Sequence, residues 1–253
     1  LAGWLRGNFG AGSGYYFFGD SSGAAAAGAY DHSAREWDER LAALPYLLSI
    51  RAAGNNADAS EMPSYNDRVY VWVPGTGWSS GTWGSDVSFA SPTNTVASPA
   101  KNGLIVGSIG DVVGPNGHRD ASLASVSGFS ASGPTDDGRI KPDLVAPGES
   151  IFSTCSSGCD GYLDRTGTSS SAAGVAGAMT ALVDDLQRQT DDQLRGSSWR
   201  ALLLHTATDL GPAGPDYTTG WGLVDAAAAA RLLDAHQHKS QRILETVIQD
   251  PQP

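Results

Sequence analysis

Three consecutive serines, Ser169 to Ser171, stand in residues 165–178, RTGTSSSAAGVAGA, ahead of a run of small residues. A serine hydroxyl is a nucleophile when a base removes its proton. The small residues have helical spacing, which predicts a close-packed helix from about Ser169 to Gln187. A helix N-terminus carries unpaired N–H groups and a positive partial charge, so a first-turn serine has an oxyanion donor in its own backbone. Alternatively, Thr168 or Ser169 only caps the helix.

A second group with chemical potential is the side-chain amide of Asn55, which follows Ala52, Ala53 and Gly54 at the end of an apolar stretch. That stretch, residues 46–52, reads as a buried strand, and open α/β sheets bind ligands at the carboxyl ends of their strands. An asparagine there can donate to a developing oxyanion. The alternative is a turn residue that tolerates a left-handed conformation.

The groups of Ser169 and Asn55 must be positioned by strands and helices, which are predicted to alternate along the chain. Buried strands are predicted at 46–52, 103–109 and 142–146, and helices near 31–44, 169–187, 198–206 and 224–235. Strands that alternate with helices indicate an α/β fold with a mostly parallel sheet between helices. Residues 57–100 read as a long surface insertion with short strands such as 68–73, and residues 236–253 as a carboxyl-terminal tail.

Composition narrows the class of protein. The 253 residues carry a formal net charge of −11, which argues against nucleic acid as a partner because no basic face replaces phosphate counterions. No apolar run is long enough to span a membrane. We expect a secreted, extracellular protein, processed or truncated before Leu1. Cys155 and Cys159 would close a small disulfide loop there, whereas in the cytosol they would be free thiols.

Five stretches of the chain resemble sequence motifs of the subtilisin-like serine proteases (subtilases). They occur in the same order as in that family. They are AAGNN at 52–56, AKNGLIVG at 100–107, FSASGPTDDGRIKPDLVAPG at 129–148, GTSSSAAGVAG at 167–177 and DYTTGWGLVD at 216–225. The resemblance covers about residues 30–235 and implies a three-layer subtilisin-like fold. The helix that contains Trp37 and the long insertion resemble the larger bacterial and kexin-like branches.

The resemblance also implies roles. Ser169 matches the family's nucleophile and Asn55 its oxyanion asparagine, with the Ser169 N–H as second donor. Ala52, Ala53 and Gly54 would line one wall of the primary specificity pocket. Proteins or peptides would be the substrates, and no cofactor is required for the chemistry. Structural calcium is compatible with the family, with Asp136 and Asp137 as candidate ligands. The chain departs from the family at Ala173 and Gly174, where Pro-His or Pro-Asn is common.

The base that Ser169 needs is not found. Subtilases run Asp, His, Asn, Ser, so both missing triad members should precede Asn55. Asp20 and His32 have that order, but Asp20 lies in a Gly/Ala loop and His32 at a surface helix start, so neither fits. His205, on an apolar helix, reads as a packed core histidine.

We therefore expect residues 1–235 to be a partial subtilase catalytic domain whose amino-terminal part is missing. A truncated chain, a nicked two-part enzyme and a pseudo-protease each account for this. By itself, the chain should be a weak protease or none. The alternative from another class is a binding module, in which the tryptophans of the insertion present aromatic faces to glycans or peptides.

Overall fold

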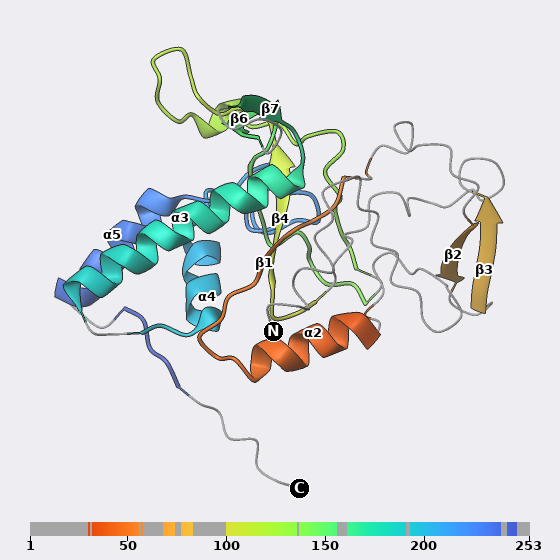
Figure 1. The fold of residues 1–253 in the computed structure, drawn as a ribbon, viewed down its shortest axis with the longest axis horizontal. Coiled ribbons are helices and arrows are strands. Elements are labelled where there is room, and N and C mark those ends of the chain that lie inside the picture. The colour runs from red at the N-terminus through yellow and green to blue at the C-terminus, as the bar shows by residue number, and fades with distance from the viewer. Residues whose placement is uncertain are drawn as a thin grey trace, which may run out of the picture. The chain divides into compact units, whose positions relative to one another are not determined.

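The computed structural model describes residues 30, 32–55, 57, 68–73, 77–82, 100–135, 137–155, 161–190, 193–238 and 242–246. The chain divides into two compact units (Figure 1). One comprises Leu1–Ala27 and Ser64–Ser88, and the other comprises Gly28–Pro63 and Phe89–Pro253. In the first unit, strands β2 (Arg68–Val73) and β3 (Gly77–Thr82) form an antiparallel hairpin, which confirms the strand expected at 68–73.

The second unit is built on a parallel sheet with strand order β1 (Ile50–Ala52), β4 (Leu104–Ile109), β5 (Leu144–Pro147). Every residue of β4 is buried, as expected for a strand with neighbours on both faces and both edges. Beyond β5 the pairing continues through a single parallel bridge between Val145 and Leu223. The α/β class with a parallel sheet is confirmed.

Strand β1 is shorter than the predicted strand at 46–52. Residues 45 and 46 form a turn, and residues 47–49 have no regular structure. Leu44, Tyr46 and Leu47 are exposed at 42%, 56% and 50%. The helix expected to reach residue 44 ends at Ala42. The apolar composition of this stretch thus predicted a strand over a segment that is only a link.

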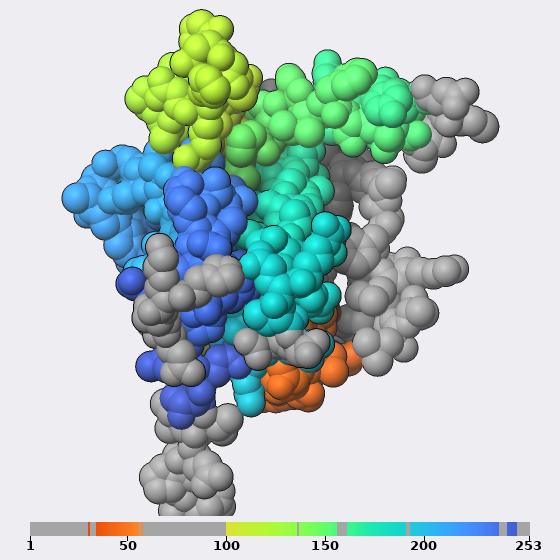
Figure 2. Space-filling model, turned by 90° about the vertical axis from the view of Figure 1, so that its left-hand side faces the viewer, coloured from red at the N-terminus to blue at the C-terminus, as the bar shows by residue number. Residues whose placement is uncertain are grey.

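Within the described residues, helices occupy each of the four segments where a helix was predicted. They are α2 (His32–Ala42), α3 (Thr168–Gln189), α4 (Gly196–Thr206) and α5 (Ala226–His238), with a short 3₁₀ turn η2 (Ala121–Leu123). Helices α3, α4 and α5 share one core with the sheet, and α5 lies beside α3 in Figures 1 and 2. On the other face of the sheet, Ile105 packs against Ala53 and Ala131.

Helix α3 buries one face only. Ala172, Val175, Met179, Leu182 and Leu186 recur at helical spacing and are buried in the core with the sheet. The small residues between them were expected to pack closely as well. Instead Ala173, Gly174, Ala176 and Gly177 are exposed. No helix within the described residues is long and apolar enough to cross a membrane.

A second hairpin was not predicted. Strands β6 (Ile151–Thr154) and β7 (Tyr162–Arg165) pair antiparallel. On its outer surface Phe152 and Tyr162 are stacked, with ring centroids 5.3 Å apart. Strand β7 ends two residues before Gly167, so this hairpin delivers the chain to the start of α3.

A buried ion cluster joins the sheet to α4. The Asp143 carboxylate accepts hydrogen bonds from Lys141 Nζ at 2.6 Å and from the Ile105 N–H at 2.7 Å on one oxygen. Its other oxygen accepts from Arg200 Nη2 at 2.6 Å. Lys141 and Asp143 are almost fully buried, so each charge depends on its partners for compensation.

Removing the central carboxylate should be costly. We expect Asp143→Ala to lower the free energy of unfolding by about 3–5 kcal/mol, because Lys141 would be left as an uncompensated buried charge. Chemical denaturation monitored by circular dichroism measures the change. Asp184→Ala removes an exposed pair with Arg188 and should cost about 0–1 kcal/mol; equal losses in the two variants would contradict the role given to Asp143.

The same cluster predicts a pH dependence of stability. Burial lowers the pKa of Lys141 from 10.5 to about 8, with the nearby Asp143 opposing the shift. Between pH 8 and pH 10.5 Lys141 keeps its proton in the unfolded chain and releases it in the native chain. Lys141 therefore makes the free energy of unfolding increase with pH in this range. Chemical denaturation at pH 7.5 and pH 10 should show this increase in the free energy of unfolding for the native chain and not for Lys141→Met. An identical pH dependence in both chains would refute it.

Candidate active site

Helix α3 begins at Thr168, and its first turn presents the three serines differently. Ser169 is exposed, Ser170 is half-buried and Ser171 is fully buried. Residues two apart on an α-helix point in nearly opposite directions, so burial of Ser171 turns Ser169 towards solvent. Of the three hydroxyls, that of Ser169 is the accessible one.

The side chain of Asn55 meets the start of α3. Its Oδ1 accepts hydrogen bonds from the Thr168 N–H at 2.9 Å and from the Thr168 hydroxyl at 2.8 Å. The Gly54 N–H in turn donates to Thr168 Oγ1 at 3.2 Å. Asn55 therefore satisfies a helix N–H that would otherwise lack an acceptor. Neither Thr168 nor Ser169 acts as the N-cap, since that position is Gly167 and it makes no side-chain capping bond.

These contacts fix which way the Asn55 amide faces. A backbone N–H can only donate, so the carbonyl oxygen of Asn55 must face Thr168 and Nδ2 must point the other way. Gly167, with φ 152°, lies beside Nδ2 and has no side chain to occupy that position. A side-chain carbon on Gly167 would lie 3.2 Å from Asn55 Nδ2 and 3.3 Å from Ser169 Oγ. An amide donor and a hydroxyl thus border one space that the glycine keeps clear.

The backbone N–H of Ser169 is the second donor at this place. Among the described residues no acceptor takes it, although the N–H groups of Thr168, Ser170 and Ser171 are all hydrogen-bonded. Two donors and an exposed hydroxyl at a helix N-terminus can hold a negatively charged oxygen next to a nucleophile. Gly167 was not singled out from the sequence, and Thr168 was considered only as a helix cap, although both lie within the GTS stretch.

Residues 52–54 lead from β1 to Asn55. The Ala53 N–H donates to the Val106 carbonyl at 2.9 Å, and the Gly54 carbonyl accepts from the Ala131 N–H at 3.0 Å. Ala53 is fully buried, while Ala52 and Gly54 are half-buried. Residues 53 and 54 are therefore hydrogen-bonded to two different parts of the chain, at Val106 and at Ala131. These bonds fix the segment that carries Asn55 to the start of α3. Its role as a specificity-pocket wall stays a prediction.

The histidines lie elsewhere in the described structure. His205 is exposed on the last turn of α4, so the expectation of a packed core histidine is wrong. His236 Nδ1, on α5, accepts from the N–H groups of Arg242 and Ile243. Asp20 lies outside the described residues, and none of the hydrogen bonds of the described part joins Ser169 to a histidine.

The metal and disulfide predictions concern residues that are described only in part. The carboxylate of Asp137 is engaged by Arg139 Nε and by the Thr135 hydroxyl, and Asp136 lies outside the described residues. In the part that is described, no group of three or more His, Cys, Asp or Glu side chains is placed to hold a metal. Cys159 also lies outside it.

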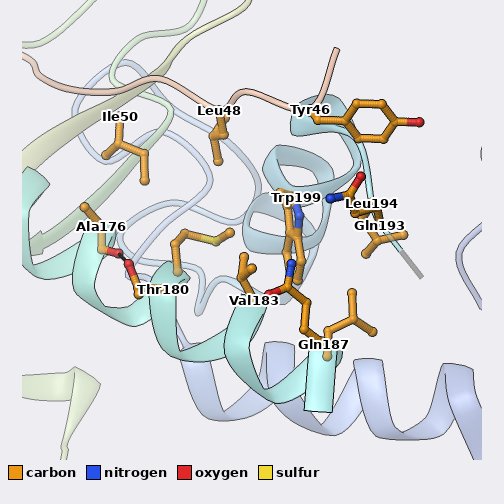
Figure 3. Close-up of a pocket in the computed structure, with 12 residues that line it drawn as sticks. Tyr46, Leu48, Ile50, Ala176, Thr180, Val183, Gln187, Gln193, Leu194 and Trp199 are labelled. Atoms are coloured by element: carbon orange, nitrogen blue, oxygen red, sulfur yellow. Dashed lines mark hydrogen bonds between the residues drawn. The ribbon is translucent and has the colours of Figure 1, made fainter. Parts of the chain in front are cut away.

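An apolar groove of about 380 Å³ lies along α3 (Figure 3). Leu48 and Ile50 face Ala176, Thr180 and Val183 of the helix across it. Because an α-helix rises about 1.5 Å per residue, Ala176 lies about 10 Å along the axis from Ser169. The groove is thus separate from the space between Asn55 and Ser169.

Comparison with known proteins gives a family match over most of the chain. The model of the subtilase family matches residues 11–222. C5a peptidase from Streptococcus pyogenes is 43% identical over 72 residues, which are 28% of this chain and 6% of that protein. Serine protease/ABC transporter B family protein tagB from Dictyostelium discoideum is 59% identical over 34 residues, 13% of this chain and 2% of that protein.

A similar solved structure is that of the CspB protease from Clostridium perfringens. It is 31% identical, covers 52% of this chain and 26% of that chain, and has a TM-score of 0.43. The matched stretches are thus a small part of these much longer proteins.

Proposed function

Because this chain belongs to the subtilase family, we propose that it is the nucleophile-bearing part of a serine endopeptidase that hydrolyses peptide bonds in proteins. Its substrates are proteins or peptides, and its nucleophile is Ser169. The single observation that carries the proposal is the contact between Asn55 and the start of α3. That contact holds the Asn55 side chain at the start of α3 through its amide oxygen, with the amide nitrogen and Ser169 Oγ both beside Gly167.

The reaction follows from the positions of these groups. Ser169 Oγ attacks the carbonyl carbon of the scissile peptide bond as a base takes its proton. The carbonyl oxygen becomes an oxyanion and accepts hydrogen bonds from Asn55 Nδ2 and from the Ser169 N–H. Collapse of this tetrahedral intermediate breaks the C–N bond, and the base returns the proton to the leaving amine. Water then hydrolyses the acyl-enzyme by the same route.

The proposed reaction also requires a base and a carboxylate that orients the base. We assign them to an amino-terminal segment of the same enzyme that is not among these 253 residues, and we expect the chain to be weak or inactive without it. The chemistry needs no cofactor; a calcium ion, if bound, is structural. The net charge of −11 and the family support a secreted enzyme with no nucleic-acid partner.

The competing function is a catalytically inactive binding module. In the β2–β3 hairpin Trp72 stands opposite Trp78 in register, and paired aromatic residues can stack on sugars or peptides. Such a module would retain glycan or peptide binding with Ser169 replaced by alanine.

A fluorophosphonate probe tests the proposal. The probe is incubated with the chain alone and with the chain co-expressed with the upstream coding region, and the modified peptide is identified by mass spectrometry. Modification at Ser169 in the complemented form supports the endopeptidase. Absence of modification in both forms would rule it out.

A further inference from the structure

The first turn of α3 rests on a glycine from another part of the chain. Gly148 directly follows β5, and its N–H donates to the Ile109 carbonyl at 3.0 Å, at the end of β4. Its own carbonyl accepts from the Gly167 N–H at 2.8 Å. Gly148 therefore links the ends of two central strands to the residue that precedes the helix.

Gly148 has no room for a side chain. A Cβ at this position would overlap Ser171 Oγ and would lie 2.5 Å from Ser108 Oγ and 2.8 Å from the Gly167 carbonyl oxygen. Its φ is not positive, unlike that of Gly167. Glycine is thus required here by space and not by backbone conformation.

The two hydroxyls above Gly148 are fully buried. Ser108 Oγ is hydrogen-bonded to Ser127 Oγ at 2.9 Å, whereas Ser171 Oγ has no hydrogen-bond partner in the described part of the chain. A buried hydroxyl without a partner is unfavourable. Hydrogen bonding therefore does not hold Ser171 in place, and its close packing on the Gly148 backbone does.

We propose that Gly148 is a positioning residue for Ser169. It supports α3 at two points, through the hydrogen bond from Gly167 and through the contact with Ser171. Ser171 and Ser169 lie on opposite sides of the first turn, so the depth of Ser171 sets how far Ser169 stands out beside Asn55. The catalytic consequence rests on the proposed function, but the structural one does not.

A methyl group on Gly148 should move this turn. Protein interiors are close-packed, and an added carbon displaces its neighbours instead of compressing them. Asn55 holds Thr168 from the other side, so the turn would have to tilt and carry the Ser169 hydroxyl and N–H away from Asn55 Nδ2. A misplacement of about 1 Å can reduce a reaction rate about 100-fold.

Hydrogen exchange of the backbone amides tests the structural consequence in the full chain. In Gly148→Ala the amides of Gly167, Thr168 and Ser171 should exchange at least about 10-fold faster, while those near Leu182 and Leu186 stay unchanged. Gly128→Ala is the matched control, because a Cβ there meets no atom within 4 Å. Gly148→Ala combined with Ser171→Ala removes the worst overlap and should recover part of the protection.

The outcomes separate the two proposals. Unchanged exchange at the first turn, or faster exchange along the whole of α3, would refute the positioning role. If Gly148→Ala does not fold, Ser171→Val adds bulk to the contact between Gly148 and Ser171 from the helix side. The same pattern of amide exchange, faster at the first turn of α3 and unchanged near Leu182 and Leu186, is then expected.

Fluorophosphonate kinetics on the complemented enzyme then test the catalytic consequence. We expect the maximal labelling rate of Gly148→Ala to fall about 100-fold, with the half-saturating probe concentration unchanged. Native-like labelling would overturn the catalytic role. If the native chain itself does not label, the proposed function fails, and the exchange pattern still decides the role of Gly148.

Discussion

Ser169→Ala should abolish labelling by a fluorophosphonate completely and should lower peptide hydrolysis by the complemented enzyme about 10⁶-fold. That magnitude is the one known for removal of the nucleophile in subtilisin. The reason is chemical: no bond can form to the carbonyl carbon once Oγ is gone. Because Ser169 is exposed on the first turn of α3, and alanine is the best helix former, the thermal unfolding temperature should not fall.

The neighbouring Ser170 provides a control for this variant. Ser170→Ala changes the adjacent half-buried position and should leave labelling within a factor of a few of the native rate. Ser171→Ala is not a control of this kind, because Ser171 packs against Gly148 and supports the first turn. Loss of labelling in Ser170→Ala with retention in Ser169→Ala would show that the nucleophile has been misassigned.

Asn55→Asp should fold as stably as the native chain but lose at least about 10²–10³-fold in labelling rate and in turnover. A carboxylate keeps an oxygen for the Thr168 N–H and hydroxyl, and its charge is favourable at a helix N-terminus. The second carboxylate oxygen takes the place of Asn55 Nδ2, so a hydrogen-bond donor is replaced by a negatively charged acceptor. The loss is at least that expected for removing one oxyanion donor, because the new oxygen also repels the oxyanion.

Asn55→Ala separates the two roles of this side chain. It should lose the oxyanion donor and also the acceptor for Thr168, so the free energy of unfolding should fall by about 1 kcal/mol. Thermal unfolding and labelling rates are measured on both variants. If Asn55→Asp were as destabilised as Asn55→Ala, the hydrogen bonds to Thr168 would not be what holds Asn55 in place. If Asn55→Asp labelled at the native rate, Asn55 would not be an oxyanion donor.

The sequence predicted those parts of the fold that depend on local patterns. The four helices of the described part were recognised because apolar residues at helical spacing, such as Val175, Met179, Leu182 and Leu186, are a property of the segment itself. Strand β4 was recognised because it is a short and mostly apolar run, LIVGSI. The antiparallel hairpin β6–β7 was missed because the alternation in IFST and YLDR extends over only four residues in each strand.

Burial was the property least well predicted. His205 was expected inside and is exposed, and Ala173 and Gly174 were expected to pack against neighbours and are exposed as well. In each case the residue type suggested an apolar environment, but exposure depends on which elements pack nearby.

The sequence by itself determined that Ser169 begins a helix and that Asn55 follows a strand, because both statements concern neighbouring residues. Only the tertiary structure decided that these two residues share one space. The hydrogen bonds from Thr168 to Asn55 join positions 113 residues apart, and Gly148 reaches α3 from the end of β5. Such contacts depend on how the sheet and the helix are packed against each other. No local pattern encodes that packing, which turns a serine at a helix start into a candidate nucleophile.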